Sequence, residues 1–134
     1  MKLARLIYSS SLKPHVDHTE IKKIHEVAEE QNRKLRVTGM LIFGNENFLQ
    51  AIEGDRDVIN SLYDKIFHDP RHHQLIIRSY QEINDRKFNR FAMKLILLTQ
   101  ANAQFVLQFS TSELFNPSEM TSESALKMML ALRD

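Results

Sequence analysis

The sequence predicts an α+β fold, a ferredoxin-like sandwich with the element order β-α-β-β-α-β-β. Three observations lead to this fold class. Five segments have strand-like patterns, two segments among them have helical spacing, and 134 residues, 43% of them hydrophobic, suffice for one domain with a core. We expect a five-stranded mixed sheet with two helices on one face and C-terminal helices on the other.

The first strand is expected over residues 3–10, where the side chains follow a period of two. This period places Tyr8 on the same face as Ala4 and Leu6. Arg5 falls on the opposite face. Tyr8 is therefore expected on the core-facing side of its strand.

The first helix is expected over residues 19–34. A stripe of residues recurs there at steps of three and four, formed by Ile21, Ile24, Ala28, Gln31 and Leu35. Asn32 lies four residues after Ala28, on the edge of this stripe. The opposite face carries opposite charges four residues apart, which is typical of a helix surface in water.

A β-hairpin is expected next, with strands over residues 37–43 and 48–54 and a turn at residues 44–47. In its second strand, Gln50 shares a face with Phe48. A carboxamide is therefore expected on an otherwise apolar strand face.

The second helix is expected over residues 55–67, and the last two strands over residues 75–83 and 91–98. One face of this helix carries Val58, Ile59, Leu62 and Ile66. The helix should stop before Pro70, which cannot continue an α-helix. The polar segment 84–89 joins the two strands.

Residues 1–98 are expected to form the main domain, and residues 99–134 a helical extension on the second face of the sheet. Apolar residues suited to this face lie within residues 103–109. A second apolar stripe, near the end of the sequence, consists of Leu126, Met129 and Leu130.

Two positions can begin the last helix. Asn116, Pro117 and Glu119 match its N-cap, N1 and N3 positions. Thr121 is an alternative N-cap for a later start.

Composition and charge exclude several classes of function. Eighteen basic and seventeen acidic residues leave a formal charge of +1, so no electrostatic footprint indicates binding to nucleic acid or to an anionic membrane. No apolar run approaches the roughly 20 residues of a membrane span, and the N-terminus lacks a signal-peptide core. A soluble, cytoplasmic protein is expected. The absence of cysteine excludes disulfides and thiolate nucleophiles.

Neither a phosphate loop nor a metal centre is indicated. The three glycines form no G-x-G-x-x-G motif and no P-loop. His68, His72 and His73 are close in sequence, but Pro70 interrupts the helix that would align them, and no carboxylate-histidine motif accompanies them.

Tyr8 and Gln50 are the main candidates for function, because each is a polar side chain on a core-facing strand side. A buried amide without partners costs about 1 to 3 kcal/mol. Two interpretations follow. Tyr8 and Gln50 either satisfy only each other, or they also meet a ligand.

Four segments, in this order and spacing, resemble the BLUF family of blue-light sensors that use flavin. They are RLIYSS at residues 5–10, Asn32 with VTGML at residues 37–41, FLQAIEG at residues 48–54, and the pattern Arg86-x-Phe88-x-x-Phe91-x-Met93. The similarity covers about residues 2–98, which is most of the chain.

The resemblance implies that FAD is held non-covalently, with its isoalloxazine ring between the two helices. Tyr8 and Gln50 would form a hydrogen-bonded pair beside the ring, and Asn32 would bond the polar edge of the ring. Gln31 occupies a more variable polar position near the flavin. FMN and riboflavin are distinguished from FAD only by the resemblance.

Further residues match positions that contact the flavin in similar proteins. Ile24 and Ile66, one on each helix, would sandwich the ring. Arg71 and His72 would contact the flavin's side chain and phosphates.

Met93 and Phe91 are implied as parts of the switch. Met93 matches a methionine thought to move when the switch operates. Phe91 replaces a tryptophan that is often found in the family, so models that need an indole N–H cannot apply here. An apolar ring can still exchange places with Met93, and this pair is kept as a possible signal relay.

The resemblance also implies a sensor rather than an enzyme. Since only residues 99–134 follow the sensor, the output should pass through contacts with a separate protein effector or through a changing homo-oligomer.

Two other functions stay open. An acylphosphatase-like enzyme would share the fold but needs a glycine-rich anion loop after the first strand, and residues 9–14 contain no glycine. A chromophore-free regulatory or ligand-binding module would use Tyr8 and Gln50 only as structure, and it would be colourless when purified.

Overall fold

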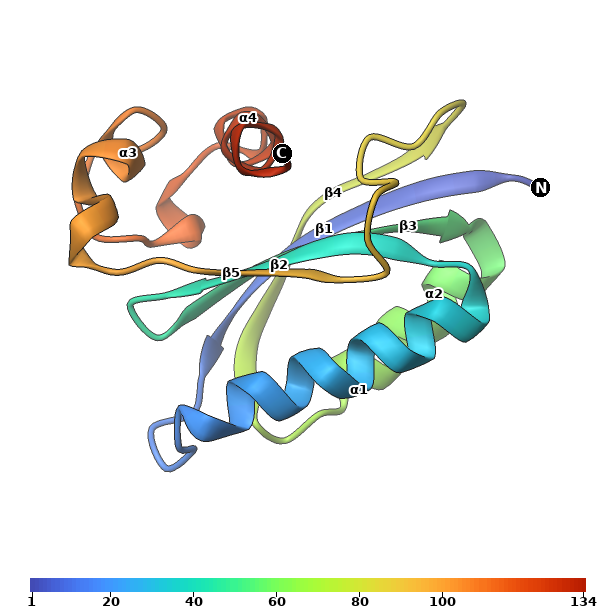
Figure 1. Cartoon of the computed structure of the whole chain (residues 1–134), viewed down its shortest axis with the longest axis horizontal. Coiled ribbons are helices and arrows are strands. Elements are labelled where there is room, and N and C mark those ends of the chain that lie inside the picture. The colour runs from blue at the N-terminus through green and yellow to red at the C-terminus, as the bar shows by residue number, and fades with distance from the viewer.

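The computed structural model describes the whole chain, residues 1–134, and has the α+β architecture that the sequence predicts (Figure 1). The elements follow in the order β1 (Leu3–Leu12), α1 (Thr19–Leu35), β2 (Thr38–Gly44), β3 (Asn47–Asp55), α2 (Arg56–Phe67), β4 (His72–Ile83), β5 (Lys94–Leu97), η1 (Gln100–Asn102), α3 (Ala103–Leu107), η2 (Pro117–Glu119) and α4 (Ser122–Leu132). The predicted order of five strands and two intervening helices is confirmed. None of the helices is both long and apolar enough to cross a membrane.

The five strands form one mixed sheet in the order β4-β1-β3-β2-β5. The first four pair antiparallel in the ferredoxin-like arrangement, and β5 runs parallel to β2 at the edge. In the register of β1 and β3, Tyr8 lies directly opposite Gln50. Residues opposite each other on paired strands point to the same face, so these two side chains are neighbours.

Helices cover both faces of the sheet, with α1 and α2 on one face and α3 and α4 on the other (Figure 1). Two hydrophobic cores result. The core on the side of α1 and α2 includes Leu6, Leu41, Phe48, Ile52 and Met93. The core on the side of α4 includes Ile7, Met40, Leu49, Phe88 and Met129. Successive side chains of β1 and β3 therefore enter the two cores alternately, as the period of two in the sequence predicts.

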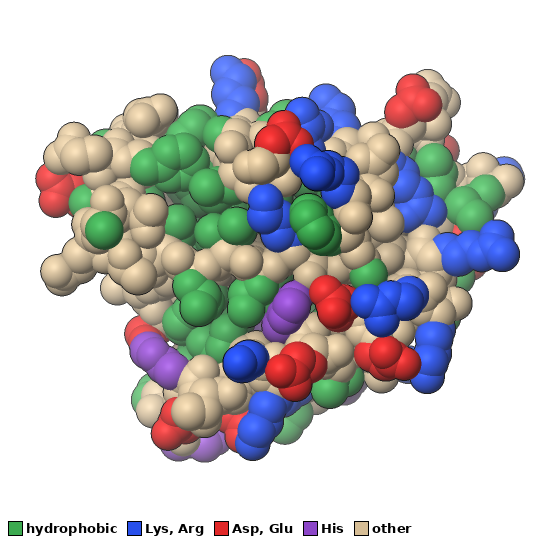
Figure 2. Space-filling model, viewed as in Figure 1, with side chains coloured by type: hydrophobic (Ala, Val, Ile, Leu, Met, Phe, Trp, Pro, Cys, Tyr) green, Lys and Arg blue, Asp and Glu red, His purple; other side chains and the backbone are tan.

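Local chemistry explains the bounds of α1. The Thr19 amide donates to the Asp17 carboxylate over 2.8 Å, which satisfies a free N–H at the start of the helix. Arg36 then adopts a left-handed conformation, with φ of 58°, and ends the helix. The outer surface of α1 carries interspersed acidic and basic side chains (Figure 2), as the spacing of its charges predicts. Leu35, placed on the apolar stripe by its spacing, is exposed instead.

The last helix uses the later of its two predicted starts. Thr121 is the N-cap of α4, and its hydroxyl accepts a hydrogen bond from the Ser124 amide over 3.0 Å. The earlier start at Asn116 is wrong, because Pro117–Glu119 forms the separate 3₁₀ helix η2. The buried residues of α4 are Ala125, Met128 and Met129, whereas Leu126 and Leu130 are only half-buried.

Two strands start three residues away from their predicted positions. β4 starts at His72, three residues earlier than predicted, and β5 is limited to Lys94–Leu97. Residues 84–93 instead form the β4–β5 loop. Contacts with residues that are distant in the sequence hold this loop in place. No local sequence pattern reveals these contacts.

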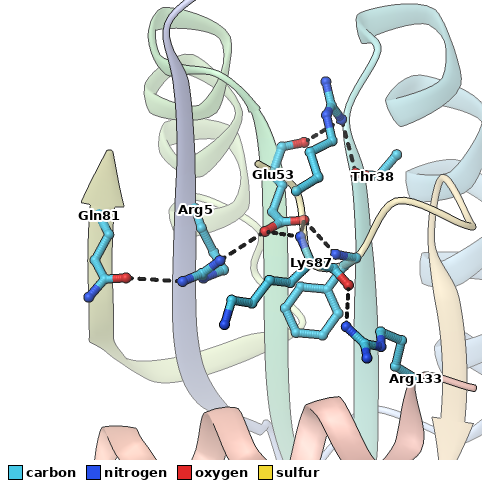
Figure 3. A network of polar contacts seen from close by, with 8 residues as sticks. Arg5, Thr38, Glu53, Gln81, Lys87 and Arg133 are labelled. Atoms are coloured by element: carbon cyan, nitrogen blue, oxygen red, sulfur yellow. Dashed lines mark hydrogen bonds and ion pairs between the residues drawn. The ribbon is translucent and has the colours of Figure 1, made fainter. Parts of the chain in front are cut away.

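A buried ion pair anchors the β4–β5 loop on the α4 side of the sheet (Figure 3). Arg5 Nη1 lies 3.1 Å from Glu53 Oε2, and Glu53 is fully buried. The Glu53 carboxylate also accepts hydrogen bonds from the main-chain amides of Lys87 and Phe88, over 2.6 to 3.0 Å. A buried carboxylate needs such partners, so Glu53 fixes the loop to β3.

Arg86 and Gly39 hold the loop at two further points. The Arg86 guanidinium donates to the carbonyl oxygens of Arg36 and Glu53 over 2.9 and 3.1 Å. The Gly39 amide donates to the Phe91 carbonyl oxygen over 3.1 Å. The loop therefore approaches β5 along a defined path.

Candidate functional site

Tyr8, Gln50 and Met93 form a hydrogen-bonded series inside the core. The Tyr8 hydroxyl donates to Gln50 Oε1, and Gln50 Nε2 lies 3.6 Å from the Met93 sulfur. All three side chains are buried. Burial raises the pKa of the Tyr8 phenol well above its ordinary value, so Tyr8 is a neutral hydrogen-bond donor at physiological pH.

A cavity of about 260 Å³ opens between α1, α2 and the sheet. Its volume is close to the lower limit for small-molecule sites, which is about 300 Å³. Tyr8 and Gln50 form part of its floor. Every residue predicted to bind the cofactor lines this cavity, namely Ile24, Gln31, Asn32, Gln50, Ile66, Arg71 and His72. The two helices and the sheet thus bring together residues that are up to 48 positions apart in the sequence.

The walls and the floor of the cavity differ in chemistry. Ile24 on α1 and Ile66 on α2 are half-buried apolar residues that pack against the core below. Asn32 is buried, and its Nδ2 donates to the Ala92 carbonyl oxygen over 2.9 Å. A carboxamide has two N–H donors and an acceptor oxygen, so Asn32 keeps further capacity for a ligand. Such a site suits a flat, largely apolar molecule with a polar edge.

Arg71 lies at one end of the cavity beside Asp69. Its guanidinium donates to both oxygens of the Asp69 carboxylate, with a shortest distance of 2.7 Å. Arg71 Nη1 also lies 3.7 Å from Glu20 Oε2. Burial alone would raise the pKa of Asp69, but the hydrogen bonds from Arg71 outweigh burial and hold it below its usual range. Asp69 therefore stays ionised and orients Arg71.

Both ring nitrogens of His72 are used within the protein. Nε2 lies 2.7 Å from the Ile66 carbonyl oxygen and Nδ1 lies 2.8 Å from the Ser10 hydroxyl. Because a carbonyl only accepts, Nε2 carries the proton, and in the neutral ring Nδ1 accepts from Ser10. Burial lowers the pKa of His72, which favours this neutral form. His68 and His73 are not part of the cavity.

Phe91 does not lie in the cavity. It precedes β5, is 43% exposed, and its ring centroid lies 5.8 Å from the Arg90 guanidinium carbon and 5.6 Å from Lys94 Nζ. Met93, two residues later, is buried beside Gln50. The two members of the predicted relay pair thus occupy different environments, one at the surface and one in the core.

Two residues beside Tyr8 and Met93 are not predicted from the sequence. His25 Nε2 lies 2.6 Å from the Met93 carbonyl oxygen, although His25 is outside the apolar stripe of α1. Tyr63 on α2 places its ring 5.7 Å from that of Tyr8, edge to face. Both contacts join separate elements, so only the three-dimensional arrangement reveals them.

The arrangement places a neutral phenol and a carboxamide at the floor of a ligand-sized cavity, with a thioether behind the carboxamide. A family model described as "Sensors of blue-light using FAD", or BLUF, matches residues 3–94. The chain belongs to the BLUF family. The predicted family is thereby confirmed, and with it a flavin-based blue-light sensor domain.

Curated relatives of this BLUF chain are much longer proteins. The blue light- and temperature-regulated antirepressor BluF of Escherichia coli is 32% identical over 109 residues, which are 79% of this chain and 26% of that protein. The photoactivated adenylate cyclase subunit beta of Euglena longa is 31% identical over 86 residues, 64% of this chain and 10% of that protein. The chain thus spans about a quarter of the first relative and a tenth of the second.

Solved structures of other proteins share the fold. BlsA in its ground state matches with a TM-score of 0.86 and 24% identity, over 96% of this chain and 87% of that one. BlrB in its dark state matches with a TM-score of 0.78 and 24% identity, over 98% and 97%. A bacterial light-regulated adenylyl cyclase matches with a TM-score of 0.71 and 31% identity, over 79% and 33%. The ferredoxin-like fold class is confirmed.

Proposed function

We propose that this chain senses blue light through FAD bound non-covalently between α1 and α2, and that it passes the signal on by protein contacts. One observation carries the proposal. Tyr8 and Gln50, which are hydrogen-bonded to each other and lead on to Met93, lie at the floor of the cavity that all the predicted cofactor-binding residues line. Bound FAD would supply the blue-light absorption and, once excited, a strong oxidant.

The residues of the cavity fit a flavin. Ile24 and Ile66 would hold the two faces of the ring, one from each helix. Asn32, with unused hydrogen-bonding capacity, would meet the polar edge of the ring, and Gln31 lies one residue away on α1.

Arg71 and His72 are the proposed contacts for the flavin's side chain and phosphates. The Arg71 guanidinium is held by Asp69 but retains part of its surface for an anion. His72 is neutral and already bonded at both nitrogens, so it would support this end of the cavity by packing and by orienting the main chain.

Gln50 is proposed as the switch because its amide has different groups at its two ends. Oε1 now accepts from Tyr8, and Nε2 faces the Met93 sulfur. Rotation by half a turn would exchange these groups, and tautomerisation would also change the donor pattern. After such a rotation Oε1 would face the sulfur, itself a weak acceptor, so the contact that holds Met93 would be lost.

The output is proposed to be non-enzymatic. Residues 1–98 would form the flavin-binding domain, and residues 99–134 would form the part that changes its contacts with an effector or with other copies of the chain. The family and its regulatory relatives support this reading. The cytoplasmic location stays a prediction.

Absorption spectroscopy tests the proposal directly. The purified protein should be yellow, and blue light should shift its flavin absorption reversibly without bleaching it. Acid extraction followed by chromatography should release FAD rather than FMN or riboflavin. A colourless protein that takes up no added flavin would instead support a chromophore-free module.

A further inference from the structure

Lys94 connects the switch to the opposite face of the sheet. It directly follows Met93 and is the first residue of β5. Met93 belongs to the core on the side of α1 and α2. The Lys94 side chain reaches to the other side, where Nζ donates to the carbonyl oxygens of Leu132 and Arg133 over 3.1 and 3.0 Å. The peptide unit between Met93 and Lys94 therefore joins the residue that contacts Gln50 to the residue that bonds the end of α4.

The end of α4 needs such a partner. The last carbonyl groups of a helix have no partner within the helix, and they carry the negative end of its dipole. The last turn of α4 contains no basic residue of its own. Lys94 supplies the missing cation from β5. A second contact, from Arg133 Nη1 to the Lys87 carbonyl oxygen over 3.1 Å, joins the same end of α4 to the β4–β5 loop (Figure 3).

Besides its packing in the core, Met93 has polar contacts with two side chains. Gln50 Nε2 faces its sulfur, and His25 Nε2 bonds its carbonyl oxygen. β5 is only four residues long and pairs with β2 alone, beginning opposite Met40. Met93 and Lys94 share one planar peptide unit, so a displacement of the Met93 main chain also shifts the main chain of Lys94.

We propose that Lys94 is the positioning residue that couples the flavin switch to α4. It holds the C-terminal end of α4 against the sheet while Met93 stays beside Gln50, and it releases that end when Met93 moves. This inference rests on the proposed function and adds the residue through which the signal crosses the sheet.

Lys94→Met tests the coupling, because methionine keeps most of the aliphatic stem and removes the ammonium group. Absorption spectra and hydrogen exchange of the α4 amides are measured on the full flavin-loaded chain, in darkness and under blue light. In the unmodified protein, light should speed exchange at the end of α4 by roughly two- to five-fold. Lys94→Met should already exchange faster in darkness and change little on illumination, while its absorption shift stays normal.

Two matched variants control for loss of charge and for misfolding. Lys127→Met removes an exposed lysine of α4 that pairs with Glu123 over 3.2 Å, and it should behave as the unmodified protein. Lys94→Arg keeps a cation at the proposed position and should restore the light response of α4.

The outcomes separate the two proposals. A normal absorption shift with no light response at α4, or a full response in Lys94→Met, overturns the role of Lys94 and leaves the sensor intact. Absence of any absorption shift in the flavin-loaded, unmodified protein overturns the proposed function and the coupling together.

Discussion

The Gln50 side chain lies 3.6 Å from the Met93 sulfur through its amide nitrogen, which joins β3 to the residue just before β5. This contact is weak, because a thioether is a poor acceptor. It is also the contact that a reoriented Gln50 amide would lose. The Gln50–Met93 contact therefore links a local hydrogen-bond change to the edge of the sheet.

Met93→Leu should separate the switch from its output. Leucine has a similar volume and no sulfur, so we expect a loss of unfolding free energy below about 1.5 kcal/mol. The light-induced absorption shift should remain, because Tyr8 and Gln50 are unchanged, whereas the light response of α4 should weaken. Urea unfolding and hydrogen exchange measure the two effects. An α4 response of full amplitude in this variant would show that Met93 carries no signal.

His25→Leu should loosen the segment around Met93. The bond from His25 to the Met93 carbonyl oxygen is worth about 0.5 to 1.5 kcal/mol, so local amides should exchange roughly two- to twelve-fold faster in darkness. Hydrogen exchange of residues 91–96 provides the measurement. His25→Gln, which keeps an N–H donor, is the control. Equal exchange in all three proteins would mean that this bond does not restrain Met93.

Glu53→Gln should destabilise the fold far more than the removal of a surface carboxylate does. It leaves Arg5 as a buried charge without its partner, which costs about 3 to 5 kcal/mol. Glu82→Gln, which removes an exposed partner of Arg56, should cost less than about 1 kcal/mol. Urea unfolding of both variants gives the comparison, and similar losses would contradict the anchoring role of Glu53.

Acidification should lower the stability of the folded protein through His72. The folded state lowers the pKa of His72, so below the unfolded value of 6.5 the unfolded chain binds the proton more readily. Stability should therefore fall as the pH drops from 6.5 toward the lower folded pKa, and it should level off below that value. Asp69, whose pKa is lowered by its hydrogen bonds with Arg71 despite burial, acts in the same direction only below the ordinary pKa of 3.8. Melting temperatures between pH 8 and pH 5 should decline less in His72→Gln, and identical declines would exclude His72 as the cause.

Much of the site follows from local patterns in the sequence. Period two in β1 and β3 correctly places Tyr8 and Gln50 on the core-facing side, and helical spacing brings Ile24 and Asn32 to one side of α1. These assignments succeed because successive side chains of a strand point to opposite faces, and a helix places residues three and four apart on one side.

Other parts depend on contacts between distant residues. The predicted last strand begins too early because residues 91–93 belong to the loop, where the Phe91 and Ala92 carbonyl oxygens accept hydrogen bonds from Gly39 and Asn32. The role of His25 was not predicted, since its partner lies 68 positions away. Phe91 has an apolar side chain typical of a strand, yet it lies at the surface beside Lys94.

The most direct test of the central claim is the light-minus-dark absorption spectrum of Tyr8→Phe beside that of the unmodified protein. The substitution removes the hydroxyl that donates to Gln50 and keeps the ring, so the flavin should still bind. We expect the unmodified protein to show a reversible shift of its flavin absorption and Tyr8→Phe to show none. A normal shift in Tyr8→Phe, with bound flavin, would contradict the proposed switch.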